Sequence, residues 1–363
     1  MSGSLDELYA AGVAAWRSGD HARAVSLARE AIGIDPRLPA LHFLEGGGLF
    51  DAGRYAHAAD AFERAAALGP GYPLALECEL RAAQCLARLD LAGGAGPALE
   101  APSEGEPAFV SVIVCSVTPQ KFDRVSDNYR RLLDRVPHEI VGVHDARSLA
   151  EGYNRGMRRA RGDVLVFSHD DIEIVSPDFA AKLARLLGEH GLVGVAGTTR
   201  AVTASWLGAG WPHLCGQIGM PAAGAGYVVT VYGAGARTVR GVQAMDGVWL
   251  AARRETAQRL GFDAATFDGW HGYDFDFSYR AHLAGERCAV ACDLLIAHAS
   301  AGGFQGDWRV YAERALAKHR AHLPPGATLP AQPELCAVEV RSGIEWRLLA
   351  RRLIERREPR RLD

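Results

Sequence analysis

Residues 163–174, DVLVFSHDDIEI, decide the fold of the central part of the chain. A short apolar run is typical of a buried β-strand, and here it leads directly into His169, Asp170 and Asp171. Adjacent carboxylates at the carboxyl end of a buried strand favour a bound cation, and oxygen ligands indicate Mg²⁺ or Mn²⁺. An acidic turn after a strand is as often a helix N-cap or a solvated loop, so the motif alone leaves both interpretations open.

The sequence on both sides of this stretch alternates between strand-like and helix-like segments. Apolar, β-branched runs at 109–117 (FVSVIVCSV) and 139–144 (EIVGVH) predict strands, and a polar segment ending at Leu133 and residues 149–161 predict helices. This alternation is typical of a parallel sheet that is covered by helices on both faces. We therefore expect an α/β domain over residues 109–322, with ligands beyond the carboxyl ends of its strands.

The first ninety residues repeat with a period of 34. Seven positions recur with identical or similar residue types, namely Gly12, Trp16, Gly19, Ala24, Ala28, Ala31 and Pro36, matched by Gly46, Phe50, Gly53, Ala58, Phe62, Ala65 and Pro70. This is the period of tetratricopeptide repeats, in which small residues let paired helices approach closely. Residues 72–89 add one amphipathic helix, so we predict an all-α domain over residues 1–90 with two repeats and a cap. Two generic helical hairpins are the alternative.

Composition sets the domain boundaries and excludes several classes of protein. The chain has 363 residues, of which 48% are hydrophobic and 23% are charged, which predicts two globular domains rather than a disordered or fibrous chain. A formal net charge of −3 provides no global field for nucleic acid, so we predict no nucleic-acid partner. Residues 91–108 are rich in Gly, Pro, Ala and Glu and are interpreted as a linker, and the Pro-rich residues 323–334 as a second one.

The C-terminal region, residues 323–363, contains a basic amphipathic helix after its linker. Eight arginines lie between Arg341 and Arg361, and they flank an apolar stripe. This helix is expected to lie on an anionic membrane surface, to dock on the repeat region or to remain a solvated surface helix, and the sequence leaves these placements open.

The expected location is cytoplasmic. No run approaches the ~20 apolar residues of a membrane helix, and the acidic N-terminus is unlike a signal peptide. Seven cysteines without a CxxC motif suit buried thiols in a reducing compartment. The basic C-terminal helix leaves open a peripheral position at the inner face of the membrane.

The order of several motifs carries a family resemblance. The motifs are SVIVCSV at 111–117, YNRGMRRARGDVLVFSHDDIEI at 153–174, MDGVWLAARRE at 245–255, GFDAATFDGWHGYDFDFSYRAHLAG at 261–285 and HASAGG at 298–303. Together they resemble the inverting family 2 glycosyltransferases of the GT-A fold, in the branch whose metal motif reads HDD rather than DxD. The resemblance spans about residues 109–305 and implies a metal-dependent transfer of a sugar from a nucleotide-sugar.

The resemblance implies a donor site and a metal site. The donor contacts it implies are Ser116, Val117, Asp145, Asn154 and Asp170, the last reaching the ribose or a metal-bound water. Asp171 is implied as a metal ligand and the late His298 as the residue that closes the metal site. Ser168 stands where many relatives have the first Asp of DxD, so either metal binding is weaker in this chain or His169 compensates as a further ligand.

The resemblance also implies a catalytic base. An inverting enzyme needs a carboxylate that takes the proton of the attacking hydroxyl, and Asp274 matches that position. We expect the helix N-terminus at Asp274 to lower its pKa. Asp276 is interpreted either as a residue that supports the side chains of the site or as one that orients the acceptor. Tyr273 replaces a more common Glu. Further sugar contacts are expected at Asp246, Gly247 and Trp270.

The sequence therefore predicts an inverting glycosyltransferase that uses Mn²⁺ or Mg²⁺ and a nucleotide-sugar, UDP-linked in this hypothesis. The acceptor is expected to be a glycan or a protein, and the repeat region is expected to bind a partner or the acceptor. Homo-oligomers are left open. The alternative is a non-catalytic scaffold with a degenerate sugar-nucleotide domain, which Ser168 and the residues around Asp145 favour. A nucleotidyltransferase would need a Gly-rich basic signature, which residues 111–121 lack.

Overall fold

The computed structural model describes residues 4–101, 109–233, 235–300, 306–331 and 333–357. The chain divides into two compact units: residues 1–97 with 340–363, and residues 98–339. Parts of the two predicted linkers, of the motif at 298–303 and of the basic C-terminal segment lie outside the described residues. Each unit is taken in turn.

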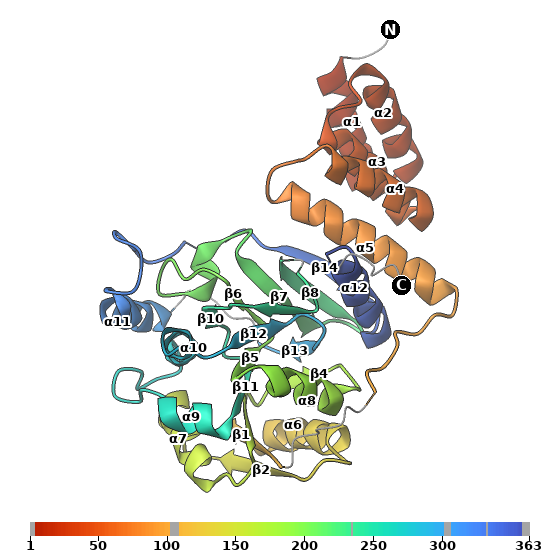
Figure 1. Cartoon of the computed structure of the whole chain (residues 1–363). Coiled ribbons are helices and arrows are strands. Elements are labelled where there is room, and N and C mark those ends of the chain that lie inside the picture. The colour runs from red at the N-terminus through yellow and green to blue at the C-terminus, as the bar shows by residue number, and fades with distance from the viewer. Residues whose placement is uncertain (1–3, 102–108, 234, 301–305, 332, 358–363) are drawn as a thin grey trace. The chain divides into compact units, whose positions relative to one another are not determined.

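The first unit begins with five helices (Figure 1). They are α1 (Leu5–Arg17), α2 (His21–Ile34), α3 (Pro39–Asp51), α4 (Tyr55–Ala67) and α5 (Leu74–Ala92). Glycines permit the close packing of neighbouring helices: a Cβ on Gly12 would lie 2.8 Å from the Leu44 side chain, and one on Gly46 would lie 2.8 Å from the ring of Phe62. An N-terminal all-α region is confirmed, and its assignment as tetratricopeptide repeats stays a prediction.

The C-terminal helix α12 (Gly343–Glu355) belongs to this unit and packs against α5. Glu345 is fully buried and pairs with Arg88, Nε to Oε1, at 2.9 Å. Asp90 accepts hydrogen bonds from both Arg351 and Arg352. The arginines of this helix are therefore neutralised in part by acids of the helical region, which matches the docked placement among the three left open.

The second unit contains a seven-stranded sheet in the order β2-β1-β3-β11-β5-β12-β9. Its strands are β1 (Val110–Cys115), β2 (His138–Val143), β3 (Val164–Ser168), β5 (Leu192–Gly194), β9 (Thr238–Arg240), β11 (Trp249–Arg253) and β12 (Cys288–Ala291). β11 is antiparallel to β3 and β5, and β9 is antiparallel to β12. The predicted parallel sheet is thus wrong in part: the sheet is mixed, because an apolar strand pattern carries no information about direction.

Helices cover both faces of this sheet, as predicted. They are α6 (Pro119–Leu132), α7 (Leu149–Arg159), α8 (Phe179–Glu189), α9 (Arg254–Leu260) and α10 (Tyr273–Leu283). Side chains alternate along β1: Val112 lies in one core with α6 and α8, and Ile113 lies in the other with α7. The strand ends are thereby held rigidly between two packed cores.

A second sheet runs in the order β10-β6-β7-β13-β4, with β8 paired to β7 and β14 paired to β8. Its strands are β4 (Ile172–Ile174), β6 (Ala196–Thr198), β7 (Leu214–Pro221), β8 (Tyr227–Gly233), β10 (Ala244–Met245), β13 (Ile296–His298) and β14 (Cys336–Val340). The unit also contains the short helix η1 (Trp206–Ala209) and α11 (Trp308–His319). Within this sheet, β7 and β8 form an antiparallel hairpin.

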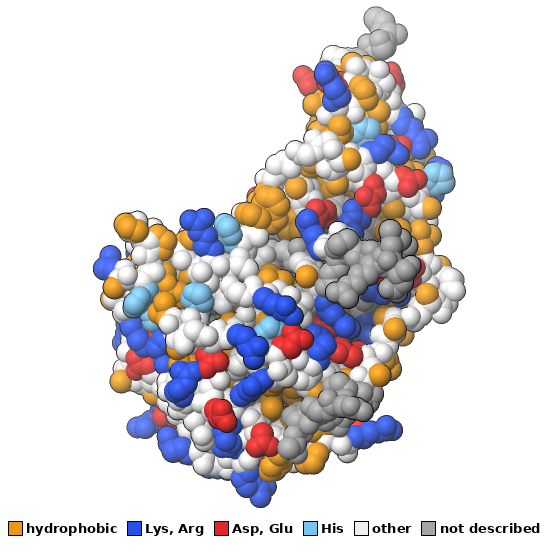
Figure 2. Space-filling view, in the orientation of Figure 1, with side chains coloured by type: hydrophobic (Ala, Val, Ile, Leu, Met, Phe, Trp, Pro, Cys, Tyr) orange, Lys and Arg blue, Asp and Glu red, His pale blue; other side chains and the backbone are white. Residues whose placement is uncertain are grey.

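The surface of the second unit shows acidic and basic side chains interspersed on the visible face (Figure 2). This distribution agrees with the nearly balanced numbers of acidic and basic residues. None of the helices in the described residues has the length and apolar character needed to span a membrane.

Candidate functional site

Two strands of the second sheet bring distant residues together at one point. β4 starts directly after Asp171, and β13 ends at His298. The two strands pair antiparallel with His298 opposite Ile172, and the amide of Ala299 donates to the Asp171 carbonyl at 2.9 Å. The pairing register thus places His298 beside Asp171, although 127 positions, 298 − 171, separate them in the sequence.

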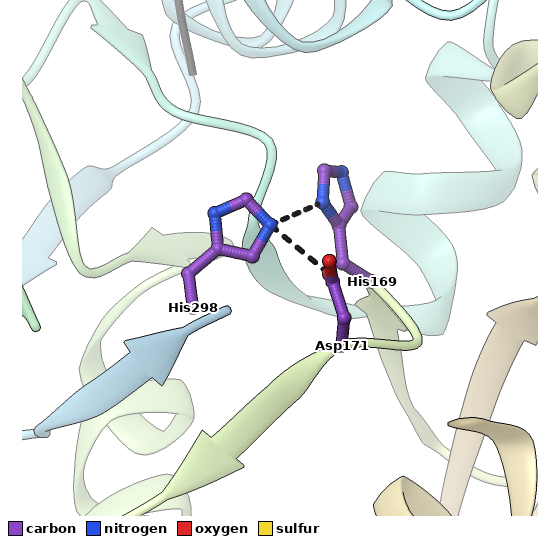
Figure 3. A group of neighbouring side chains, drawn as sticks. All are labelled: His169, Asp171 and His298. Atoms are coloured by element: carbon purple, nitrogen blue, oxygen red, sulfur yellow. Dashed lines mark hydrogen bonds and ion pairs between the residues drawn. The ribbon is translucent and has the colours of Figure 1, made fainter. Parts of the chain in front are cut away.

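The side chains of His169, Asp171 and His298 point toward one another (Figure 3). His298 Nε2 lies 3.1 Å from Asp171 Oδ1 and 3.2 Å from His169 Nδ1. One candidate ligand atom from each residue lies within 4.8 Å of the other two. Two imidazole nitrogens and a carboxylate oxygen, all partly buried, form a donor set that fits a divalent metal ion.

Electrostatics keep this cluster ready to bind a cation. Burial and the neighbouring His298 lower the pKa of His169 to about 4, so its ring is neutral at physiological pH. Burial opposes ionisation of Asp171, but hydrogen bonds from His298 and Ser300 hold the pKa of that carboxyl well below its usual range. His169 and Asp171 are therefore in the protonation states that metal binding requires.

Asp170 lies beside the cluster and faces the end of β1. Ser116 Oγ donates to Asp170 Oδ2 at 2.6 Å, and Lys121 Nζ lies 3.8 Å from Asp170 and 3.5 Å from Asp171. Ser168, which stands where many relatives have the first Asp of DxD, is fully buried at the end of β3. In this chain that position therefore lies inside the sheet.

Asp274 lies at the start of α10 and contacts the turn before β11. Its Oδ2 accepts a hydrogen bond from the Gly247 amide at 3.0 Å. A Cβ on Gly247 would overlap the Tyr273 hydroxyl and lie 2.6 Å from Asp274 Cβ, so only glycine fits there. Asp246 is partly buried in the same turn, and its Oδ1 accepts from the Val248 amide at 2.8 Å.

The pKa of Asp274 differs from the sequence-based expectation. Burial and the charge of Asp246 raise its pKa to about 7, although backbone amides around it act in the opposite direction. The expected lowering by the helix N-terminus is therefore wrong, because loss of water around the carboxylate outweighs the amide dipoles. A carboxyl that titrates near neutral pH suits proton transfer.

Three predicted substrate contacts lie at more open positions. Val117 and Trp270 expose 73% and 51% of their surfaces, respectively. Asp145 follows β2 and pairs with Arg155 at 2.8 Å, and the hydrogen bond from that guanidinium lowers its pKa. Because β1 and β2 are adjacent and parallel, Val117 and Asp145 follow neighbouring strand ends.

Asn154 holds another segment of the backbone. Its Nδ2 donates to the Phe262 carbonyl at 2.7 Å, and its Oδ1 accepts from the Phe262 amide at 2.9 Å. Both functions of the side-chain amide thus serve the segment after α9 rather than an open pocket.

Asp276 is fully buried and surrounded by basic side chains. It accepts from Arg280 Nε and His319 Nε2, each at 2.8 Å, and lies 2.6 Å from Lys318 Nζ. Burial alone would raise its pKa, but the hydrogen bond from His319 and the charge of Arg280 lower it. The structure does not bring Asp276 to the metal cluster: its contacts join α10 to α11.

Sequence reasoning missed three polar contacts at the cluster. The Tyr273 hydroxyl lies 2.9 Å from His169 Nε2, Ser300 Oγ lies 3.0 Å from His298 Nε2, and Lys121 approaches both acids. Burial raises the pKa of Tyr273 well above its ordinary value, so the hydroxyl keeps its proton. One of these three contacts had a signal in the sequence: Lys121 follows closely after the first strand, β1.

Comparison with known proteins assigns the family. A family described as "Glycosyltransferase like family" matches residues 111–314, which is more than half of the chain. The chain therefore belongs to this family and is a glycosyltransferase. No curated protein matches the chain.

Several solved structures resemble the chain at low identity. The mannosyltransferase PcManGT from Pyrobaculum calidifontis, solved with GDP-Man and Mn²⁺, is 15% identical over 77% of this chain and 81% of that chain, with a TM-score of 0.40. GalNAc-T7, solved with UDP, GalNAc and Mn²⁺, is 14% identical over 59% of this chain and 48% of that one, with a TM-score of 0.35. A mutant of the O-GlcNAc transferase from Thermobaculum terrenum is 18% identical over 38% of this chain and 30% of that one, with a TM-score of 0.21. At these scores the likeness assigns no substrate.

Proposed function

We propose that the chain is a metal-dependent, inverting glycosyltransferase of the GT-A type that moves a sugar from a nucleotide-sugar to an acceptor hydroxyl. The observation that carries this proposal is the His169, Asp171 and His298 cluster, joined through Tyr273 and its neighbours to a carboxyl that titrates near neutrality. An electron-rich cluster and a separate base are the two elements that such a transfer needs.

The three clustered residues would hold the metal ion. Bound there, a divalent ion supplies positive charge for the leaving diphosphate of the donor. Ser116 fixes the carboxylate of Asp170, which would meet the ribose or a metal-bound water. Val117 and Asp145, after neighbouring strand ends, would border the nucleotide.

Asp274 would act as the base. In an inverting transfer the acceptor oxygen bonds to the anomeric carbon, the bond to the diphosphate breaks, and Asp274 takes the acceptor proton. Its hydrogen bond to the Gly247 amide fixes one carboxylate oxygen. Asp246 would bind sugar hydroxyls, and the exposed Trp270 would stack on the acceptor.

The ligand set favours Mn²⁺ over Mg²⁺. Two of the three candidate ligands are imidazole nitrogens, and Mg²⁺ prefers oxygen ligands with near-ideal octahedral geometry. We expect Mn²⁺ to support a higher rate than Mg²⁺ at equal concentration.

Release of nucleotide from a panel of nucleotide-sugars tests the proposal, beginning with UDP-sugars and including GDP-mannose. Each donor is assayed with Mn²⁺, with Mg²⁺ and with a chelator. We expect Mn²⁺-dependent release with one donor, and the anomeric configuration of the transferred sugar, measured by NMR, tests inversion. Turnover that is unaffected by chelator would contradict the assigned metal role, and absence of both turnover and nucleotide binding would favour the scaffold alternative.

The helical N-terminal unit would bind the acceptor or a partner protein. Its support is the helical packing and the 34-residue period of the sequence. Transfer to a candidate acceptor, compared between the full chain and variants of exposed side chains on α1 to α4, tests that role.

A further inference from the structure

A chain of hydrogen bonds connects the candidate metal cluster to the candidate base. His169 Nδ1 faces His298, and its Nε2 lies 2.9 Å from the Tyr273 hydroxyl. That hydroxyl donates to the Gly247 carbonyl at 3.0 Å, while the Gly247 amide donates to Asp274. Tyr273 therefore contacts His169 of the metal cluster and Gly247, the residue whose amide holds the candidate base Asp274.

The numbers of donors and acceptors determine where the protons lie. A tyrosine hydroxyl has one proton, and the Gly247 carbonyl accepts no other hydrogen bond within the described residues. If the hydroxyl donates to that carbonyl, its oxygen can only accept from His169, so Nε2 of the neutral ring must carry the proton. The reverse arrangement leaves a carbonyl unsatisfied, which costs about 1–3 kcal/mol when the group is buried.

This proton position leaves a lone pair on His169 Nδ1. That nitrogen is the atom that faces His298 Nε2 at 3.2 Å, within the cluster with Asp171. A proton on Nδ1 would occupy the same space and block the ligand atom. A residue that binds the far nitrogen of a ligating histidine selects its tautomer and orients its ring.

We propose that Tyr273 is a positioning residue that holds His169 in the Nε2–H tautomer and so presents Nδ1 to the metal ion. The inference rests on the proposed function, because it takes the cluster to be a metal site. Tyr273 is 3% exposed, and its hydroxyl lies on the far side of the imidazole from His298, so it acts through His169. By the same bond to Gly247 it fixes the turn whose amide holds Asp274.

Tyr279 provides a matched control. It lies on the same helix as Tyr273, and both side chains are 3% exposed. Its hydroxyl donates to the His322 carbonyl at 2.8 Å. Tyr279→Phe therefore removes the same kind of bond, from a buried tyrosine hydroxyl to a backbone carbonyl, and leaves in place the two hydrogen bonds that join Tyr273 to His169 and Gly247.

The test is direct binding of Mn²⁺ to the whole chain, measured by calorimetry, for wild type, Tyr273→Phe and Tyr279→Phe. We expect the Mn²⁺ dissociation constant to rise about 10- to 100-fold in Tyr273→Phe and to stay within about twofold of wild type in Tyr279→Phe. Equal binding by wild type and Tyr273→Phe overturns the inference and leaves the proposed function intact. Failure of wild type to bind Mn²⁺ overturns the proposed function.

A second measurement does not depend on the variant. The ¹⁵N chemical shifts of the His169 ring in the metal-free wild-type chain, assigned with His169→Gln, report which nitrogen carries the proton. The expected result is a proton on Nε2, and a proton on Nδ1 overturns the inference. In Tyr273→Phe, we expect the two tautomers to be mixed, whereas an unchanged Nε2–H tautomer contradicts the assigned role.

Discussion

Two groups of ionisable side chains in the second unit differ in how their charge is neutralised. Around Asp276, the protein itself supplies Arg280, Lys318 and His319, and the carboxylate has no exposed surface. In the group of His169, Asp171 and His298, three electron-rich atoms converge on one another.

The difference separates a structural acid from a ligand. A buried carboxylate whose charge is balanced by protein cations serves the fold. A cluster of nitrogen and oxygen lone pairs with little positive charge nearby can accept an added cation. Lys121 Nζ lies 3.5 Å from Asp171 of the second group, but its side chain is 48% exposed, so it neutralises this acid only weakly.

The largest effect is expected from the base. Asp274→Asn keeps the shape of the side chain and removes its ability to take a proton, so turnover should fall about 100- to 10,000-fold. Mn²⁺ binding should be unchanged, because Asp274 is outside the ligand set. Nucleotide release and calorimetric Mn²⁺ titration check both. A loss of Mn²⁺ binding would instead place Asp274 in the metal site.

Asp276→Asn should act on stability. The substitution removes the negative charge and leaves three basic groups beside a buried amide. Loss of such a buried pairing lowers the free energy of unfolding by about 3 kcal/mol. Urea denaturation measures this loss. Asp171→Asn is the comparison, with an expected stability change of about 1 kcal/mol or less and a loss of Mn²⁺ binding. If Asp171→Asn lost stability and Asp276→Asn lost Mn²⁺ binding instead, the assignment of one acid to the fold and the other to the metal would be wrong.

The pH dependence tests the raised pKa of Asp274. A pKa of about 7 means that the ionised base is lost as pH falls below neutrality, so kcat/KM should fall about tenfold per pH unit well below pH 7. Asp246→Asn removes the second cause of the shift and should move the falling limb of the profile to lower pH, because burial is then the one remaining cause that raises the pKa. An activity that stays constant down to pH 5 would contradict Asp274 as the base.

The smallest effect is expected from Lys121→Met. Its ammonium lies 3.5 Å from Asp171 and competes with an added cation, but exposed ion pairs are worth about 0.5 kcal/mol. Mn²⁺ binding should therefore tighten by about twofold, as measured by calorimetric titration. If the donor KM rises at the same time, Lys121 also contacts the donor phosphates. The metal cluster would then resemble the surroundings of Asp276 more closely, because a protein cation would have a defined role in both.

Local sequence patterns predicted much of the fold. The 34-residue period located a helical region, and β-branched runs located β1, β2 and β3 with α6 and α7 between them. The acids after β3 marked the strand end beside which His298 lies in the structure. These features depend on residues close in sequence, where periodicity and burial have a direct physical link.

Only the tertiary structure decided the direction of β11, the partners of the acids and the pKa of Asp274. Asp274 and Asp276 are alike in sequence, two positions apart at the start of one helix, yet one faces Gly247 and the other faces α11. The contact of Tyr273 with His169 joins residues 104 positions apart. Packing between residues far apart in the sequence decides whether a charged group lies against water, an amide or a cation. Local sequence patterns give no distances between such residues, so they could not predict these surroundings.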